Sequence, residues 1–273
     1  MTALVRAFSR LILKGAPAMK LITLIENTTS NQGLTAEHGL SLYIETGTHK
    51  ILFDMGQSNA FGENAKKLGV DLTQVDLAVL SHGHYDHGGG LERFLEINHR
   101  ADIYVNRHAF GSHYNAAGKY IGLDPALGKN SRLRVTDGET KIGEGITLYT
   151  VPFPPADTSG LQRLEQGRLV PEDFRHEQYL LVEERGKTVL FTGCSHKGVL
   201  ALAEYFNPDV LIGGFHFSKI TDEAFLLQAA EQLSQRKTTF FTGHCTGKMQ
   251  YQRMKTVLGD KLHSLETGSI LEI

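Results

Sequence analysis

The chain has 273 residues, and 41% of them are hydrophobic, which is enough to bury a substantial core and excludes a disordered or fibrous protein. A formal net charge of −2 provides no broad attraction for nucleic acid or for an anionic membrane. No apolar run approaches the roughly 20 residues that span a bilayer. Two cysteines cannot form a disulfide framework, and free thiols fit a reducing compartment. We therefore expect a cytoplasmic protein without a nucleic-acid or membrane partner.

The first 18 residues differ from the rest of the chain. They carry Arg6, Arg10 and Lys14 without any acidic residue, and a second methionine, Met19, follows them. Lys14 interrupts the only apolar patch, which is too short for the hydrophobic region of a signal peptide. We expect residues 1–18 to be a disordered extension. We expect residues 19–273 to form one catalytic domain, because no internal repeat or linker-like stretch divides them.

Short apolar runs predict strands, and longer runs with helical spacing predict helices. In chain order, the first half predicts strands Leu21–Ile25, Leu40–Glu45 and Ile51–Phe53, helix Phe61–Leu68, strand Leu77–Leu80, helix Leu91–Ile97 and strand Ile103–Val105. The second half predicts strands Tyr179–Glu183 and Thr188–Phe191, helix Val199–Tyr205, strand Val210–Ile212, helix Glu223–Leu233 and strand Thr238–Phe241. This alternation is typical of α/β architectures.

Two long segments show little periodicity, namely Ala109–Arg132 and Pro152–Pro171. Loops of this length in a compact domain usually carry function. We expect them to form the mobile rim of the site, with the substrate entering between them.

Three strands of the second half end in glycine followed by a side chain that can bind a metal ion. The three sequences are Gly193-Cys194-Ser195-His196, Gly213-Gly214-Phe215-His216 and Gly243-His244-Cys245. Ligand sites gather at strand ends in α/β proteins, so these side chains are expected at one site.

The densest group of candidate ligands is Ser81-His82-Gly83-His84-Tyr85-Asp86-His87, directly after the strand 77–80. Side chains two positions apart in extended backbone point the same way, so His82 and His84 are placed to share one metal ion. A tight turn then directs Asp86 and His87 to a second ion beside it. Imidazole and carboxylate ligands suit zinc, and the segment predicts a dinuclear metal centre.

This segment resembles the His-x-His-x-Asp-His signature of the metallo-β-lactamase superfamily. Further similarity lies, in order, in Glu37-His38-Gly39-Leu40-Ser41, Leu52-Phe53-Asp54-Met55-Gly56, Thr192-Gly193-Cys194-Ser195-His196-Lys197-Gly198, Gly213-Gly214-Phe215-His216 and Gly243-His244-Cys245-Thr246-Gly247. These motifs resemble the subgroup named after 7,8-dihydropterin-6-methyl-4-(β-D-ribofuranosyl)aminobenzene-5′-phosphate synthase. The resemblance runs from about Leu21 to the C-terminus and implies a four-layer αββα sandwich.

The resemblance implies that His82 and His84 bind the first metal, and that Asp86, His87 and His244 bind the second. Two zinc ions are expected, with iron or manganese as the alternatives. The chain departs from the family twice. Val151-Pro152-Phe153-Pro154 lacks the usual mid-chain histidine, and Cys194-Ser195-His196 stands where a metal-bridging aspartate is usual. We expect His196 to complete the first ligand set, with His176 as its rival. Cys194 is either a thiolate ligand or a residue that supports the ligands from behind.

The sequence indicates a role in the site less strongly for several other residues. His216 either faces the substrate or is a buried, hydrogen-bonded histidine, and His38 is a candidate for the mouth of the site. Lys197 either meets an anionic group or is a solvated residue at a helix start. Asp54 is expected to be structural and to orient a ligand histidine from behind. Cys245 is expected to point into the core.

The leading functional hypothesis is a metal-dependent hydrolase in which activated water attacks a small, anionic organic substrate. Asp86 and His216 are the expected catalytic residues, with Asp86 holding the nucleophile or taking a proton. One alternative is the condensation for which the subgroup is named. A metal-dependent binding protein without turnover is a third hypothesis.

Overall fold

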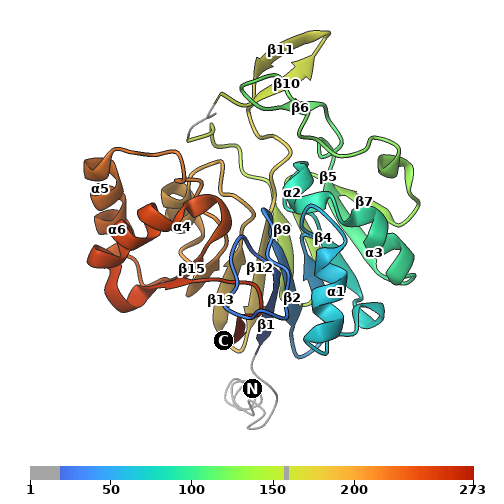
Figure 1. Ribbon diagram of the computed structural model, residues 1–273, viewed down its shortest axis with the longest axis horizontal. Coiled ribbons are helices and arrows are strands. Elements are labelled where there is room, and N and C mark those ends of the chain that lie inside the picture. The colour runs from blue at the N-terminus through green and yellow to red at the C-terminus, as the bar shows by residue number, and fades with distance from the viewer. Residues whose placement is uncertain (1–18, 157–159) are drawn as a thin grey trace, which may run out of the picture.

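The computed structural model describes residues 19–156 and 160–273. The expectation of a disordered extension at residues 1–18 falls outside these residues. Two seven-stranded sheets form the centre of the molecule, and helices cover the outer face of each (Figure 1). The architecture is the four-layer αββα sandwich expected from the sequence. Within 19–156 and 160–273, no helix combines the length and apolarity that crossing a membrane requires.

The first sheet is built mainly from the N-terminal half. Its strand order is β17 (Ile270–Glu272), β1 (Lys20–Ile25), β2 (Ser41–Glu45), β3 (Lys50–Phe53), β4 (Leu77–Val79), β5 (Asp102–Asn106) and β7 (Leu133–Thr136). Strands β3, β4, β5 and β7 run parallel, so their carboxyl ends lie along the same edge. Helices α1 (Ala60–Lys67) and α3 (Leu91–Ile97) supply apolar side chains to the outer core of this sheet.

The second sheet repeats this plan with the C-terminal half. Its order is β16 (Leu262–Ser264), β15 (Thr239–Thr242), β14 (Val210–Ile212), β13 (Lys187–Phe191), β12 (Tyr179–Glu184), β9 (Ile146–Tyr149) and β8 (Glu139–Gly143). Strands β13 to β16 are parallel. Its outer core includes side chains from α4 (Val199–Phe206), α5 (Glu223–Ser234) and α6 (Lys248–Leu258).

The two sheets share one apolar core. Alternate residues of each strand point to opposite faces, so Leu52 packs toward the helices while Ile51 and Phe53 pack between the sheets. Phe53 and Phe191, from the two sheets, have ring centroids 6.0 Å apart. Because both faces of these strands are covered, their sequences read as continuous apolar runs, which is why they were predictable.

All thirteen predicted strands and helices are present, with bounds shifted by a residue or two. The description of the two rim segments as loops was wrong in part. They contain β6 (His113–Tyr114), β10 (Gln162–Glu165) and β11 (Arg168–Pro171), which form a three-stranded antiparallel sheet that projects from the end of the sandwich (Figure 1). The hairpin between β10 and β11 turns at two residues with positive φ, Gln166 and Gly167. Its side chains are largely exposed, so no apolar alternation marked it.

The structure permits a sharp test of whether this rim is mobile. Leu164 and Leu169 on the hairpin are 45% and 46% exposed, whereas Tyr205 on α4 is 58% exposed but lies on a helix that packs against the core. Proteases cut where backbone opens locally, not merely where side chains are accessible. We predict that, within residues 19–273, brief chymotrypsin digestion cleaves after Leu164 or Leu169 first, as mass spectrometry of the fragments will show. A first cut after Tyr205 contradicts a mobile rim.

Candidate metal centre

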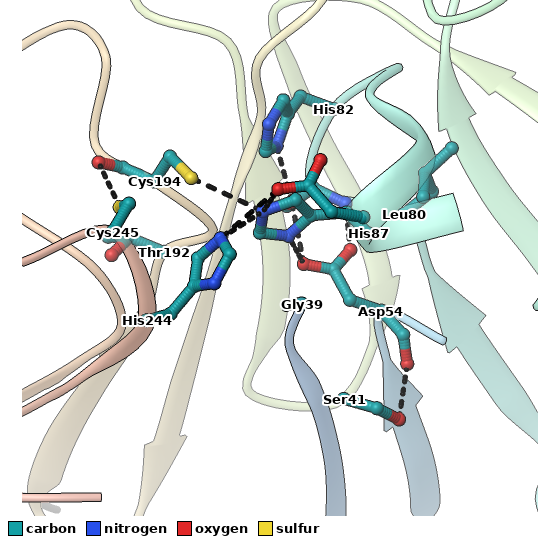
Figure 2. Close-up of polar contacts among 12 residues, drawn as sticks. Gly39, Ser41, Asp54, Leu80, His82, His87, Thr192, Cys194, His244 and Cys245 are labelled. Carbon is teal, nitrogen blue, oxygen red and sulfur yellow. Dashed lines mark hydrogen bonds and ion pairs between the residues drawn. The ribbon is translucent and has the colours of Figure 1, made fainter. Parts of the chain in front are cut away.

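The candidate ligands lie where the carboxyl ends of the parallel strands of both sheets meet. Asp54 follows β3, the segment Ser81–His87 follows β4, and Cys194 follows β13. His244 follows β15. Figure 2 shows these side chains converging from the two sheets, with His87 at the centre of their contacts. The site therefore depends on both halves of the chain.

The backbone at this edge is held in an unusual conformation. Asp54, Ser195, His216 and His244 have φ values of 58°, 57°, 56° and 50°. Positive φ is uncommon for residues other than glycine and concentrates at functional sites, where the surroundings stabilise it. Each of these residues follows the end of a strand, so the chain turns sharply and keeps its side chain at the edge of the sheet.

The buried carboxylate of Asp54 organises the first-sheet side of the site. Its Oδ1 accepts the backbone N–H of Ser81, and its Oδ2 accepts the Ser81 hydroxyl, both at 2.7 Å. Oδ2 also lies 2.7 Å from Nδ1 of His87. The Ser81 hydroxyl oxygen is in turn 2.8 Å from Nδ1 of His82. Asp54 thus orients a candidate ligand histidine from behind, as expected, and reaches a second one through Ser81.

These hydrogen bonds assign the tautomers of two histidines. Because the Ser81 hydroxyl donates its single hydrogen to Asp54, its oxygen accepts from Nδ1–H of His82. His87 likewise donates from Nδ1 to Asp54. In the neutral form of each ring the proton is therefore on Nδ1, and Nε2 carries the lone pair. Burial, followed by the neighbouring imidazoles, lowers the pKa of His82 well below its ordinary value. Neutral imidazole is the form that binds metals.

A separate network fixes His244 from the start of the chain. Its Nδ1 is 2.9 Å from Oδ1 of Asn27, and that oxygen also accepts the backbone N–H of Gly39 at 3.2 Å. The backbone N–H of His244 donates to the carboxylate of buried Glu26. The amide oxygen of Asn27 thus takes the Nδ1 proton, and Nε2 of His244 also presents a lone pair to the site.

Acceptor atoms face one another in the second-metal cluster. Nε2 of His87 lies 3.1 Å from Nε2 of His244 and 3.2 Å from Sγ of Cys194. Oδ2 of Asp86 lies 3.3 Å from Nε2 of His244. Burial lowers the pKa of His87, but the carboxylates of Asp54 and Asp86 outweigh it and raise this pKa to about 9. Without a metal ion, His87 is therefore protonated at neutral pH. Its second proton lies on Nε2, between the ring and the neighbouring donor atoms of His244 and Cys194.

The first-metal cluster contains His82, Cys194 and His196, whose donor atoms all lie within 4.8 Å of one another. The ring of His84 is 4.6 Å from that of His82 and 5.3 Å from that of His196. His196 stacks on Phe174 with ring centroids 3.9 Å apart. Burial lowers the pKa of His196 well below its ordinary value and that of His84 to about 3, so both rings are neutral.

His176, the rival of His196, lies in a different environment. Its Nδ1 accepts the backbone N–H of Gly83 at 2.8 Å, so the proton of the neutral ring is on Nε2. His176 stacks on His113 at 3.9 Å, and these two rings form a cluster with His84. His113 pairs with buried Glu172 at 2.7 Å. His84, His113 and His176 also offer donor atoms within 4.8 Å of one another, but the only lone pair of the neutral His176 ring is already engaged by Gly83.

The two remaining histidines line the mouth of the site. His216 borders the pocket, and its ring lies 4.2 Å from that of His196. The side chain of His38 is 53% exposed, and its Nε2 lies 3.2 Å from Oδ2 of Asp86. Burial raises the pKa of Asp86, but His87 and the hydrogen bonds from His244 and His38 hold it well below the usual range. The carboxylate is therefore ionised.

Lys197 and Cys245 have structural contacts. The ammonium group of Lys197 donates to the backbone carbonyl of Asp173 at 2.6 Å and does not line the pocket. The thiol of Cys245 donates to the backbone carbonyl of Cys194 at 3.6 Å. Cys245 is buried, as expected, although it also borders the pocket.

Three residues that hold the site in place were not predicted from the sequence: Glu26 and Glu177, which are buried, and Asn27, which is exposed. Glu26 and Asn27 fix His244, and Glu177 accepts the backbone N–H groups of His196 at 2.9 Å and Lys197 at 3.1 Å. A signal was present for the first two, because polar residues directly follow an apolar strand there. The partners of Glu177 follow the neighbouring strand β13, 19 and 20 residues further along the chain, so its role could be found only from the structure.

A pocket of about 770 Å³ opens onto both clusters. This size suits a small organic ligand. Both rim segments contribute to its wall, through Ile121 and Leu161, and the exposed residues Lys219 and Lys248 lie at its border. Its lining also includes the site residues His84, Asp86, Cys194, His196, His216 and His244.

The residues present fit a metal centre. Nε2 of His82, Nε2 of His84 and both ring nitrogens of His196 are buried without a hydrogen-bond partner. Leaving a buried polar group unpaired costs about 1–3 kcal/mol, so four such atoms at one place require a reason. Imidazole nitrogen, thiolate sulfur and carboxylate oxygen are the ligands that zinc prefers. A metal ion would satisfy Nε2 of His82, Nε2 of His84 and one of the two ring nitrogens of His196.

Comparisons with known proteins identify relatives of this chain. An uncharacterised protein of Methanocaldococcus jannaschii is 28% identical over 240 residues, which cover 83% of this chain and 91% of that protein. The 7,8-dihydropterin-6-methyl-4-(β-D-ribofuranosyl)-aminobenzene-5′-phosphate synthase of the same organism is 26% identical over 286 residues, covering 93% of this chain and 96% of that one.

Solved structures show the same fold. The crystal structure of Tm1679, a metal-dependent hydrolase of the β-lactamase superfamily, has a TM-score of 0.78 and 29% identity, covering 93% of this chain and 99% of that chain. Zn²⁺-bound PqqB from Methylobacterium extorquens has a TM-score of 0.60 and 11% identity, covering 93% and 100%. The family model described as the metallo-β-lactamase superfamily matches residues 34–233, which is most of the chain. The chain belongs to the metallo-β-lactamase superfamily.

Proposed function

We propose that this protein is a metal-dependent hydrolase of small, anionic organic molecules. The observation that carries the proposal is the set of buried imidazole nitrogens without partners at the base of the pocket. The similarity to Tm1679, described as a metal-dependent hydrolase, supports the reaction class.

The proposed ligands divide into two sets. His82, His84 and His196 would hold the first ion, and Asp86, His87 and His244 the second. The neutral imidazoles and the single carboxylate favour zinc, and iron or manganese would imply a different chemistry. When bound, such ions lower the pKa of coordinated water toward neutrality and polarise the bond to be cleaved.

The other residues act on the substrate and on protons. Asp86 is ionised and borders the pocket, so its carboxylate is placed to take a proton from attacking water. His216 borders the same pocket and is placed to contact the substrate beside His196. Lys219 and Lys248 provide positive charge at the border, which favours an anionic substrate group. The apolar side chains of the rim segments would limit the access of bulk water.

A second candidate is a condensation like that of the synthase relative, which is 26% identical over most of both chains. Such a reaction uses the same pocket with two organic substrates and releases no hydrolysed product. Similarity at the level of the fold does not decide between the two reactions.

An assay with generic substrates separates these functions. The protein loaded with zinc is incubated with small anionic phosphodiesters, carboxylic esters and lactones, and product formation is followed with and without a chelator. We predict chelator-sensitive hydrolysis of at least one class. Absence of hydrolysis in every class, together with chelator-sensitive coupling of a dihydropterin to a ribofuranosylaminobenzene phosphate, would instead establish the condensing enzyme.

The hydrogen bonds of the two rival histidines predict losses of zinc affinity of different size when each is replaced. His196 has two unpartnered ring nitrogens, whereas Nδ1 of His176 is engaged by Gly83. We predict that His196→Ala weakens zinc binding by at least roughly 10–100-fold, a loss seen even for residues that only support ligands. His176→Ala should retain more of the affinity. Competition with a chromophoric chelator measures the zinc affinity of each variant. A larger loss in His176→Ala than in His196→Ala would make His176 the ligand.

A further inference from the structure

Cys194 occupies a special place between the two clusters. Its Sγ lies within 4.8 Å of the donor atoms of His82 and His196, and equally within 4.8 Å of those of His87 and His244. Within residues 19–156 and 160–273, Cys194 is the only side chain that belongs both to the group with His82 and His196 and to the group with His87 and His244. The sulfur is 3.2 Å from Nε2 of His87, and Cys194 is only 3% exposed.

The charges of the proposed ligands favour a second negatively charged donor between the two ions. Five of the six are neutral imidazoles, and only Asp86 carries a negative charge. Two divalent cations held a few ångströms apart in a buried site repel each other strongly, and bulk water cannot screen them there. An anionic donor between the ions reduces this repulsion more than one at the edge. Cys194 supplies the atom in that position.

The backbone around Cys194 holds the sulfur in place. Glu177 accepts the N–H groups of the two residues at 196 and 197, and the Cys194 carbonyl accepts from the thiol of Cys245. Gly214 donates its backbone N–H to the carbonyl of Gly193 at 2.8 Å. The turn after β13 is thus fixed on both sides, and the sulfur faces the histidines.

We infer that Cys194 is a thiolate ligand shared by both metal ions, so that a sulfur atom bridges the centre. The inference rests on the metal centre of the proposed function and adds a ligand to it. On binding, the thiol loses its proton to solvent and the sulfur donates electron pairs to the two ions. A thiolate in this position shifts the metal preference toward zinc or iron and away from magnesium or calcium.

Cobalt titration tests the shared ligand without an activity assay. Co²⁺ is added stepwise to metal-free protein, and the near-ultraviolet absorption from thiolate-to-cobalt charge transfer is recorded against bound metal. The wild-type band should grow through the first and second equivalents, because the sulfur contacts both ions. A band that is complete after one equivalent shows that Cys194 serves one ion only and overturns the inference.

Two variants assign the band. Cys194→Ser should lose it and bind the second Co²⁺ at least about 10-fold more weakly. Cys245→Ser is the matched control, since Cys245 is buried beside the same turn but belongs to neither metal group, and it should keep the band. Circular dichroism checks that both variants fold. A band that survives in Cys194→Ser overturns the inference. Failure of the wild-type protein to bind any Co²⁺ would instead contradict the metal centre itself.

Discussion

The hydrogen bonds of the buried Asp54 carboxylate set the chemistry of the whole site. Through its direct bond to His87 and its bond to Ser81, it keeps the ring protons of His87 and His82 on Nδ1. The Nε2 lone pairs are thereby turned toward the centre, where they meet the donors from the other sheet. If Asp54 were not an acceptor at both positions, the same histidines would present N–H groups and repel a cation.

The second sheet is brought to this centre by contacts that cross the fold. Glu26 and Asn27, which follow the first strand of the first sheet, fix His244 near the end of the chain. Within the second sheet, Glu177 holds the turn that carries Cys194 and His196. The core between the sheets sets their spacing, and these polar contacts set the orientation of the ligands. Binding of a metal ion would therefore be coupled to the packing of the two halves.

The sequence predicted the central strands and the gathering of the His82–His87 side chains at the end of β4, because buried strands and dense polar motifs are local signals. It did not predict α6, whose polar sequence buries only Met254 and Leu258, or the exposed β10–β11 hairpin. It left His176 and His196 as rivals, because tautomers depend on hydrogen bonds between distant segments. The hydrogen bond that Gly83 donates to Nδ1 of His176 favours His196 as the ligand, and it could not be foreseen from the sequence.

Metal analysis of the Asp54→Asn variant tests the central claim most directly. Asparagine tolerates the positive φ of this position, so the fold should persist. Its amide group would donate where the carboxylate accepts, which moves the ring protons of His82 and His87 to Nε2. The account predicts that the wild-type protein purified without added metal contains two metal ions per chain by mass spectrometry. It predicts that the folded variant loses most of both. A folded variant that retains two ions with undiminished affinity would contradict it.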